Sequence, residues 1–198
     1  MGYVVPLEEA STEVVIKKSR FIAYAKGIVS REAGMLWLAE VKKQYPDARH
    51  HCWAYMIGDP KCALNAGMGD DGEPSGTAGK PILHVLHHKE VGNIMVIVIR
   101  YFGGIKLGAG GLTRAYSQAA QEVMAVLVTE QQVAMVKIGL SCDFSLEQQV
   151  RYWIEYLGGL VLEVDYTQQV AMKVSVPLKE QLTLTSQLRA GQCDFKIL

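Results

Sequence analysis

Acidic, hydroxyl and glycine residues gather in one segment of the chain, DDGEPSGTAGKP at positions 70–81. Its acids could hold a hard cation or act in general acid–base catalysis, and its glycines could turn backbone amides toward an anion. The segment is not a nucleotide-binding P-loop, because Pro74 and Pro81 occupy the positions where that motif needs a glycine and a hydroxyl residue. A surface turn held by side-chain hydrogen bonds and two prolines is the competing interpretation.

A second glycine-rich segment, RYFGGIKLGAGGL at 100–112, follows the apolar run IMVIVI at 94–99. A strand that leads through glycines into a helix places helix N-terminal amides where they can bind an anion. The spacing does not match the G-x-G-x-x-G dinucleotide fingerprint. The glycines could equally let the helix pack closely on the strand, and both interpretations can hold together. The sequence therefore predicts an anion site at this turn.

Histidine and nucleophile patterns give weaker signals. His50 and His51 are adjacent in a predicted strand, so their side chains face opposite ways and cannot easily share a metal. Three more histidines have the spacing of one helix face: His84, His87 and His88. Zinc would need a fourth ligand, which the pattern does not supply, so a solvated helix face is favoured. Cys52 and Ser75 have no base and orienting group visible in the sequence. We expect no catalytic residue, no metal and no cofactor.

Composition places the 198-residue chain among ordinary globular proteins, with 49% hydrophobic residues and a formal net charge of zero. A protein that coats nucleic acid through bulk charge would be more basic, so any basic site must be local. One local cluster is visible, because Lys17, Lys18 and Arg20 stand beside Phe21. The scattered cysteines, the acidic N-terminal segment and the lack of a long apolar run predict a cytoplasmic protein with reduced thiols and no membrane partner.

Hydrophobic periodicity divides the chain into two domains, 1–131 and 132–198. In the first domain it predicts these elements: strands at 14–16, 22–25, 51–57 and 93–101, helices at 30–44, 82–88 and 111–128, and a long loop over 58–81. The second domain is predicted to contain strands at 133–142, 160–166, 170–176 and 194–198, with helices at 145–157 and 178–190. Its order, β-α-β-β-α-β, is that of a ferredoxin-like domain.

Three strings in order, RHHCWAY (49–55), DDGEPSGTAGKP (70–81) and VIVIRYFGGIKLGAGGLTRAY (96–116), closely resemble the YigZ/IMPACT family. The resemblance covers residues 11–128, and the remainder resembles the small domain of bacterial members. It implies an α+β protein, with an N-terminal domain resembling ribosomal protein S5 domain 2 followed by a ferredoxin-like domain. Eukaryotic relatives regulate translation under amino-acid starvation. Their additional RWD domain is not seen in this sequence, so we do not transfer their mechanism.

These observations lead us to expect a non-enzymatic cytosolic protein that binds RNA or the translation machinery and regulates translation. Its partners would be RNA or ribosome-associated factors, with an anion at the glycine-rich turn; the oligomeric state stays open. We expect the 70–81 loop to fold beside Arg100 and the glycine turn as one wall of a shared cleft. The candidate ligand-binding residues are Arg49, His50, Asp70, Asp71, Glu73, Thr77, Lys80, Arg100, Tyr101, Gly103, Gly104 and Gly108.

Two other functions fit the same residues. In a metal- or phosphate-dependent enzyme, the three acids of the 70–81 loop would bind a metal or transfer protons, while Lys80 and Arg100 would orient an anionic substrate. In a protein–protein adaptor, the loop would instead be an epitope for a partner.

Overall fold

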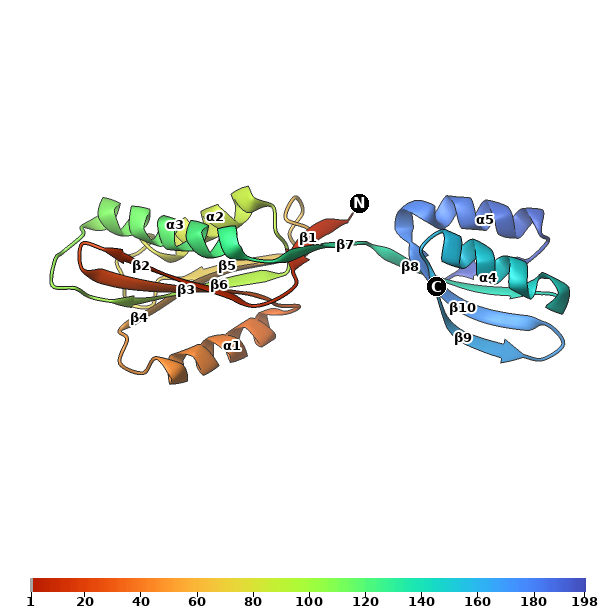
Figure 1. The fold of residues 1–198 in the computed structure, drawn as a ribbon, viewed down its shortest axis with the longest axis horizontal. Helices are drawn as coiled ribbons and strands as arrows, with labels where there is room; N and C mark the ends of the chain where they lie inside the picture. Colours follow the sequence, from red (N-terminus) through yellow and green to blue (C-terminus); the bar gives the residue numbers. More distant parts are fainter. Residues whose placement is uncertain (1) are drawn as a thin grey trace. The chain divides into compact units, whose positions relative to one another are not determined.

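The computed structural model describes residues 2–198 and is an α+β protein, as the sequence predicts (Figure 1). It contains two compact units, one formed by Tyr3–Gln132 and the other including Val133–Leu198. In the described part of the chain, no helix is long and apolar enough to cross a membrane.

The first unit is built on a five-stranded sheet with the strand order β2-β3-β6-β4-β5 and antiparallel pairing throughout. The strands are β2 (Ala10–Ile16), β3 (Ser19–Gly27), β4 (His50–Ile57), β5 (Asn65–Gly69) and β6 (Ile94–Tyr101). Six of the eight residues of the central strand β6 form the apolar run IMVIVI, and the strand is buried on both faces. Such a run suits a strand that is covered by helices on both sides.

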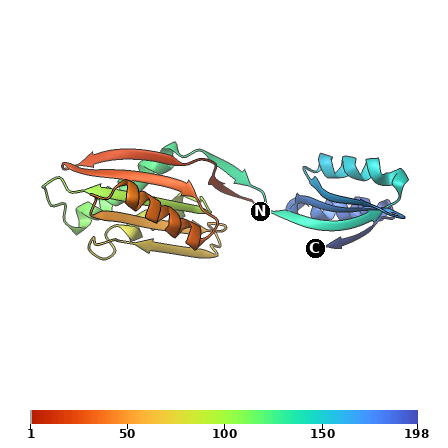
Figure 2. The same ribbon diagram turned by 90° about the horizontal axis from the view of Figure 1, so that it is seen from below.

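Three helices cover this sheet: α1 (Arg31–Gln44), α2 (Gly79–Lys89) and α3 (Ala109–Val126). Helices α2 and α3 lie on one face and α1 lies on the other (Figures 1 and 2). Helix α1 begins where the sequence predicts, because the Ser30 side chain accepts a hydrogen bond from the Ala33 amide at 3.2 Å. Two further strands, β1 (Tyr3–Pro6) and β7 (Thr129–Gln132), pair with each other.

One end of the sheet gathers most of the candidate residues. The strand register sets Arg20 opposite Tyr101, His50 opposite Arg100 and Trp53 opposite Gly69. The end of β6, the start of β3, the start of β4 and the end of β5 therefore meet there. The chain leaves β5 and β6 at this end and enters α2 and α3. We call this the loop end of the sheet.

The sequence predicts an uninterrupted loop over 58–81, and this prediction is wrong because β5 lies within it. The strand lacks β-branched residues, so its composition hides it. Its glycines leave room for aromatic side chains of the neighbouring strand β4. A Cβ on Gly67 would stand 2.8 Å from the Tyr55 ring, and one on Gly69 would stand 2.6 Å from the Trp53 ring. Those two rings are stacked with centroids 5.8 Å apart and occupy the space that the glycines leave.

The second unit has the predicted β-α-β-β-α-β order. Its elements are β8 (Met135–Cys142), α4 (Glu147–Tyr156), β9 (Leu160–Tyr166), β10 (Val170–Pro177), α5 (Gln181–Ala190) and β11 (Asp194–Ile197). The sheet order is β11-β8-β10-β9, and both helices pack on one face of it (Figure 1). The ferredoxin-like prediction is confirmed.

Candidate functional site

The first acid of the 70–81 loop binds the start of helix α2. The Asp70 carboxylate accepts hydrogen bonds from the amides of Gly76 at 2.7 Å, Ala78 at 3.1 Å and Gly79 at 2.8 Å. Burial works to raise the pKa of Asp70, but these amide hydrogen bonds outweigh it and lower the pKa. The glycine-rich loop therefore does cradle an anion at a helix N-terminus, and the anion is the protein's own carboxylate.

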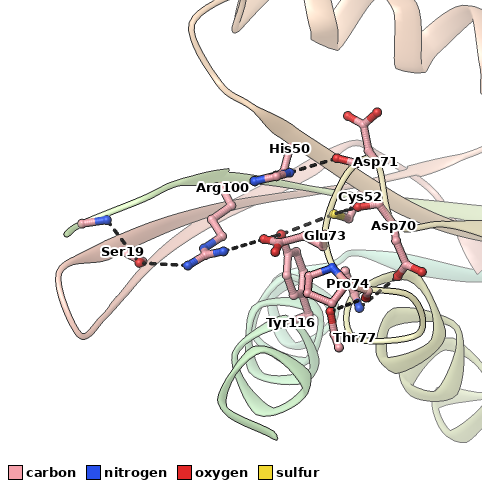
Figure 3. A network of polar contacts seen from close by, with 12 residues as sticks. Ser19, His50, Cys52, Asp70, Asp71, Glu73, Pro74, Thr77, Arg100 and Tyr116 are labelled. Carbon is pink, nitrogen blue, oxygen red and sulfur yellow. Dashed lines mark hydrogen bonds and ion pairs between the residues drawn. The ribbon is translucent and has the colours of Figure 1, made fainter. Parts of the chain in front are cut away.

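The second acid ties the loop to strand β4 and helix α1. Asp71 accepts hydrogen bonds from Lys42 Nζ at 3.0 Å and from the His51 amide at 2.8 Å. Its backbone carbonyl lies 2.9 Å from His50 Nδ1 (Figure 3). Burial tends to raise the pKa of Asp71, yet Lys42 and the His51 amide bring the pKa below its ordinary value. His50, a candidate RNA contact from the sequence, thus helps to hold the loop in place.

The third acid forms a buried ion pair. Glu73 Oε1 lies 2.7 Å from Arg100 Nη1, and the two side chains are only 3% and 7% exposed. Tyr116 donates its hydroxyl to the same Glu73 oxygen at 2.8 Å, and Cys52 donates its thiol to the Tyr116 oxygen at 3.3 Å (Figure 3). Burial raises the pKa of Cys52 to about 12, so this thiol stays protonated at neutral pH and is a poor nucleophile.

Arg100 is fixed on its other side as well. Its Nη2 lies 3.5 Å from Ser19 Oγ, which also accepts a hydrogen bond from the Gly103 amide at 3.3 Å. The guanidinium lies 5.6 Å from the centroid of the Phe21 ring and 5.7 Å from that of Phe102. The sequence predicts that Arg100 binds a ligand in a cleft that it shares with the 70–81 loop. In the structure Arg100 is only 7% exposed and pairs with Glu73, so its guanidinium is not an open contact for a ligand.

The remaining candidates from the loop and β4 divide into buried and exposed residues. The Thr77 hydroxyl is buried and donates to the Pro74 carbonyl at 2.7 Å, so it supports the turn. Arg49 and Lys80 are exposed, just before β4 and in the first turn of α2. Within residues 2–198, no group of three histidine, cysteine or acidic side chains is placed to hold a metal ion.

The candidates of the second glycine-rich segment lie along the turn between β6 and α3. Tyr101 is half-buried, with the Arg20 guanidinium 5.6 Å from its ring centroid. Gly104 and Gly108 have positive φ angles of 85° and 70°, which favour glycine, and nothing lies within 4 Å of where a Cβ would stand. Gly103 has a different role, because a Cβ there would lie 1.9 Å from the Lys18 backbone. This close contact packs the β2–β3 turn against the β6–α3 turn.

That contact sets two turns that carry lysines side by side, a juxtaposition that sequence reasoning did not assemble. Lys17 and Lys18 form the two-residue β2–β3 turn with φ angles of 47° and 64°, the positive values of a type I′ hairpin. The β6–α3 turn carries Lys106, and the second turn of α3 carries Arg114. All four side chains are exposed. We define the basic rim as Lys17, Lys18, Lys106 and Arg114.

The basic rim has no acidic counterpart. The nearby Glu13 is already paired with Arg20, at 2.7 Å between Oε1 and Nε. The first turn of α3 carries no acidic residue. No rim residue forms an ion pair with any carboxylate in the described part of the chain. The one signal in the sequence was the Lys17–Arg20 cluster, and nothing in the sequence indicated its contact with Gly103.

The comparisons with known proteins agree with this architecture. Residues 17–124 match the family model described as the Impact N-terminal domain, and residues 140–190 match a domain of unknown function, DUF1949. An IMPACT family member of Haemophilus influenzae is 42% identical over 79% of this chain and 78% of its own length. The IMPACT family member YigZ of Escherichia coli is 33% identical over 94% of this chain and 92% of its own.

One solved structure shows the same relationship over the whole chain. A crystal structure described as that of a hypothetical protein is 31% identical, covers 100% of this chain and 97% of its own, and superposes with a TM-score of 0.73. The structure titled as the two-domain translational regulator Yih1 is 28% identical, covers 59% of this chain and 45% of its own, and has a TM-score of 0.39. Family model, relatives and full-length structural match together establish that the chain belongs to the IMPACT family.

Proposed function

We propose that this protein is a non-enzymatic regulator of translation that binds RNA of the translation machinery through the basic rim. One observation carries the proposal. At the loop end, the acids Asp70, Asp71 and Glu73 are engaged by groups of the protein itself, whereas the exposed rim cations have no carboxylate partner within residues 2–198. An exposed cluster of unpaired positive charge is the electrostatic footprint of a site for phosphate groups.

The translational setting of the proposal comes from the family. The resemblance implies that eukaryotic members regulate translation, and this chain belongs to the same family. Fold and family do not establish what a site binds, so the RNA part of the proposal depends on the basic rim. Because the whole chain has a formal net charge of zero, affinity must come from this local cluster and is expected to be modest.

The rim would bind the sugar–phosphate backbone. Each lysine acts as a compact charge that neutralises one phosphate and releases a counterion. For a single strand, the logarithm of the affinity then falls with the logarithm of the salt concentration by about 0.7 for each phosphate contact. Strong salt dependence is therefore the signature that separates this mode of binding from apolar contact with a protein partner.

A direct test measures RNA binding by fluorescence anisotropy at increasing salt. We expect the wild-type protein to bind a mixed-sequence RNA at low salt and to lose it as salt rises. The variant Lys18→Glu with Lys106→Glu should lose most of this binding. The control is Lys61→Glu, which changes an exposed lysine at the opposite end of the same sheet and should bind as the wild type does. No RNA binding at low salt, or equal binding by both variants, would contradict the proposal.

The geometry does not favour the metal-dependent enzyme. The oxygens of Asp70 and Asp71 accept hydrogen bonds from backbone amides and Lys42, and Glu73 is closed off by Arg100 and Tyr116. A metal would have to displace these partners. The adaptor alternative predicts a partner that stays bound when salt rises, which the same titration distinguishes from RNA.

A further inference from the structure

Phe102 is an aromatic side chain that the fold leaves facing solvent at the basic rim. It follows the last residue of β6 and precedes Gly103, the glycine against which the Lys18 backbone packs. Its side chain is 55% exposed. Exposed phenylalanine gives up most of the free energy that burial of its ring would supply. A ring held outside at a charged rim is therefore a candidate contact surface.

The ring has a defined support. The Arg100 guanidinium lies over it, 5.7 Å from the ring centroid. Arg100 is itself held by Glu73 at 2.7 Å and is 7% exposed, so its position is set by the buried network. A cation over an aromatic face is attractive and orients the ring. Phe102 is thus positioned by the interior of the domain while more than half of its surface stays accessible.

The turn to which Phe102 belongs has open space beside two of its glycines and carries a lysine. No atom lies within 4 Å of the Cβ positions of Gly104 and Gly108 in the same turn. The packing of Gly103 places the Lys18 turn on one side, and Lys106 follows four residues after the ring. A ligand with a flat face and negative charges would therefore meet the ring and the rim lysines in adjoining turns.

We propose that Phe102 is a stacking platform for an unpaired base, which makes the basic rim a site for single-stranded RNA. This inference rests on the proposed function and names the form of RNA. In a duplex the base faces are already stacked, whereas a single strand can lay a base on an aromatic ring. The adjacent phosphates would meet Lys18 and Lys106. A protein partner is less well matched, because the ring stands among cations.

The experiment compares a short fluorescein-labelled single-stranded RNA with a blunt duplex of the same sequence. We expect the single strand to bind more tightly to the wild-type protein. Phe102→Leu keeps an apolar side chain over Arg100 but removes the aromatic face, and it should weaken single-strand binding about 5- to 140-fold, the range of one base stack. Duplex binding and the salt dependence should stay the same. Phe102→Tyr should restore the affinity.

The matched control is Phe144→Ala, because Phe144 is also 55% exposed but lies in the other unit, where it stacks on Tyr166. It should bind RNA as the wild type does. Equal single-strand affinity of wild type and Phe102→Leu would overturn the stacking site while leaving the proposed function intact. So would equally tight binding of duplex and single strand. Absence of binding to either RNA would remove both proposals, and thermal melts of each variant exclude unfolding as the cause.

Discussion

The 70–81 loop and the basic rim lie at the same end of one sheet, but they differ in charge pairing. The acidic groups of the loop are paired within the protein, whereas the cations of the rim are not paired with carboxylates of the described residues. In the loop, Asp70 binds amides at the start of α2, Asp71 binds Lys42, and Glu73 binds Arg100. Each of these carboxylates is therefore engaged by a group of the domain itself, and the pair of Glu73 with Arg100 is buried. The rim residues stand outside, and none of them pairs with a carboxylate in residues 2–198.

This difference shows that a segment rich in acidic, hydroxyl and glycine residues is not necessarily a binding site. The loop has more acids, hydroxyls and glycines than any other segment, and hydrogen bonds within the protein engage its carboxylates. The basic rim contains only lysine and arginine side chains, yet these side chains remain available to bind a partner. Residues of the loop should therefore govern stability, and residues of the rim should govern binding.

The largest expected effect is on stability, from Glu73→Ala. The change leaves the Arg100 guanidinium buried without its carboxylate, which typically costs about 3–5 kcal/mol. It also removes the acceptor of the Tyr116 hydroxyl. Urea unfolding followed by tryptophan fluorescence measures the loss. The matched control is Glu13→Ala, which removes a carboxylate from an exposed pair with Arg20 and should cost far less. Similar losses in both variants would mean that the buried network is not special.

A steric change at the junction of the two regions comes next. Gly103→Ala places a Cβ 1.9 Å from the Lys18 backbone, so the β2–β3 turn must move. We expect a loss of about 1–3 kcal/mol, as for overpacking of a close contact. RNA binding should weaken as well, because the rim loses its geometry. Gly110→Ala is the control, since its Cβ meets only Arg114 at 3.9 Å within helix α3, and it should be neutral or stabilising. Equal stability of both variants would contradict the packing.

The next effect depends on pH. Asp70 has a folded-state pKa below its ordinary value of 3.8, so its stabilising contribution is present above pH 3.8 and is lost as the pH falls through the folded-state value. Asp70→Asn removes the negative charge and one of the two acceptor oxygens, and it should cost about 1–3 kcal/mol at neutral pH, as for hydrogen bonds to a charged group. Urea unfolding at decreasing pH should show wild type and variant converging below pH 3.8. A deficit that stays constant into acid would contradict the role assigned to the carboxylate.

The smallest effect on stability should come from the rim itself. Lys18→Ala and Lys106→Ala remove exposed side chains without ion-pair partners in the described residues, so each should change the free energy of unfolding by no more than about 0.5 kcal/mol. Each should nevertheless reduce the salt slope of RNA binding by about 0.7. A lysine variant that destabilised the domain strongly, or left the slope unchanged, would break the contrast between loop and rim.

The sequence predicted those helices and strands whose hydrophobic pattern lies within one short stretch of the chain. The apolar run of β6 indicated a strand covered on both faces, and the second unit followed its predicted order. Strand β5 was missed because its glycines leave room for the rings of Trp53 and Tyr55, which lie on the neighbouring strand. The rim was missed for the same reason: Lys18 and Gly103 meet only in the folded sheet. Likewise, nothing local shows whether an arginine such as Arg100 is buried against Glu73 or free.

Mapping of the contact by ultraviolet crosslinking tests the central claim most directly. The 198-residue protein is irradiated with bound RNA at low salt, and mass spectrometry identifies the peptides that carry a nucleotide. We predict crosslinks in the peptides that contain Lys17–Lys18 and Phe102–Lys106, and their loss in Lys18→Glu with Lys106→Glu. Crosslinks confined to the 70–81 loop or to residues 133–198 would contradict the account, because RNA would then bind away from the basic rim.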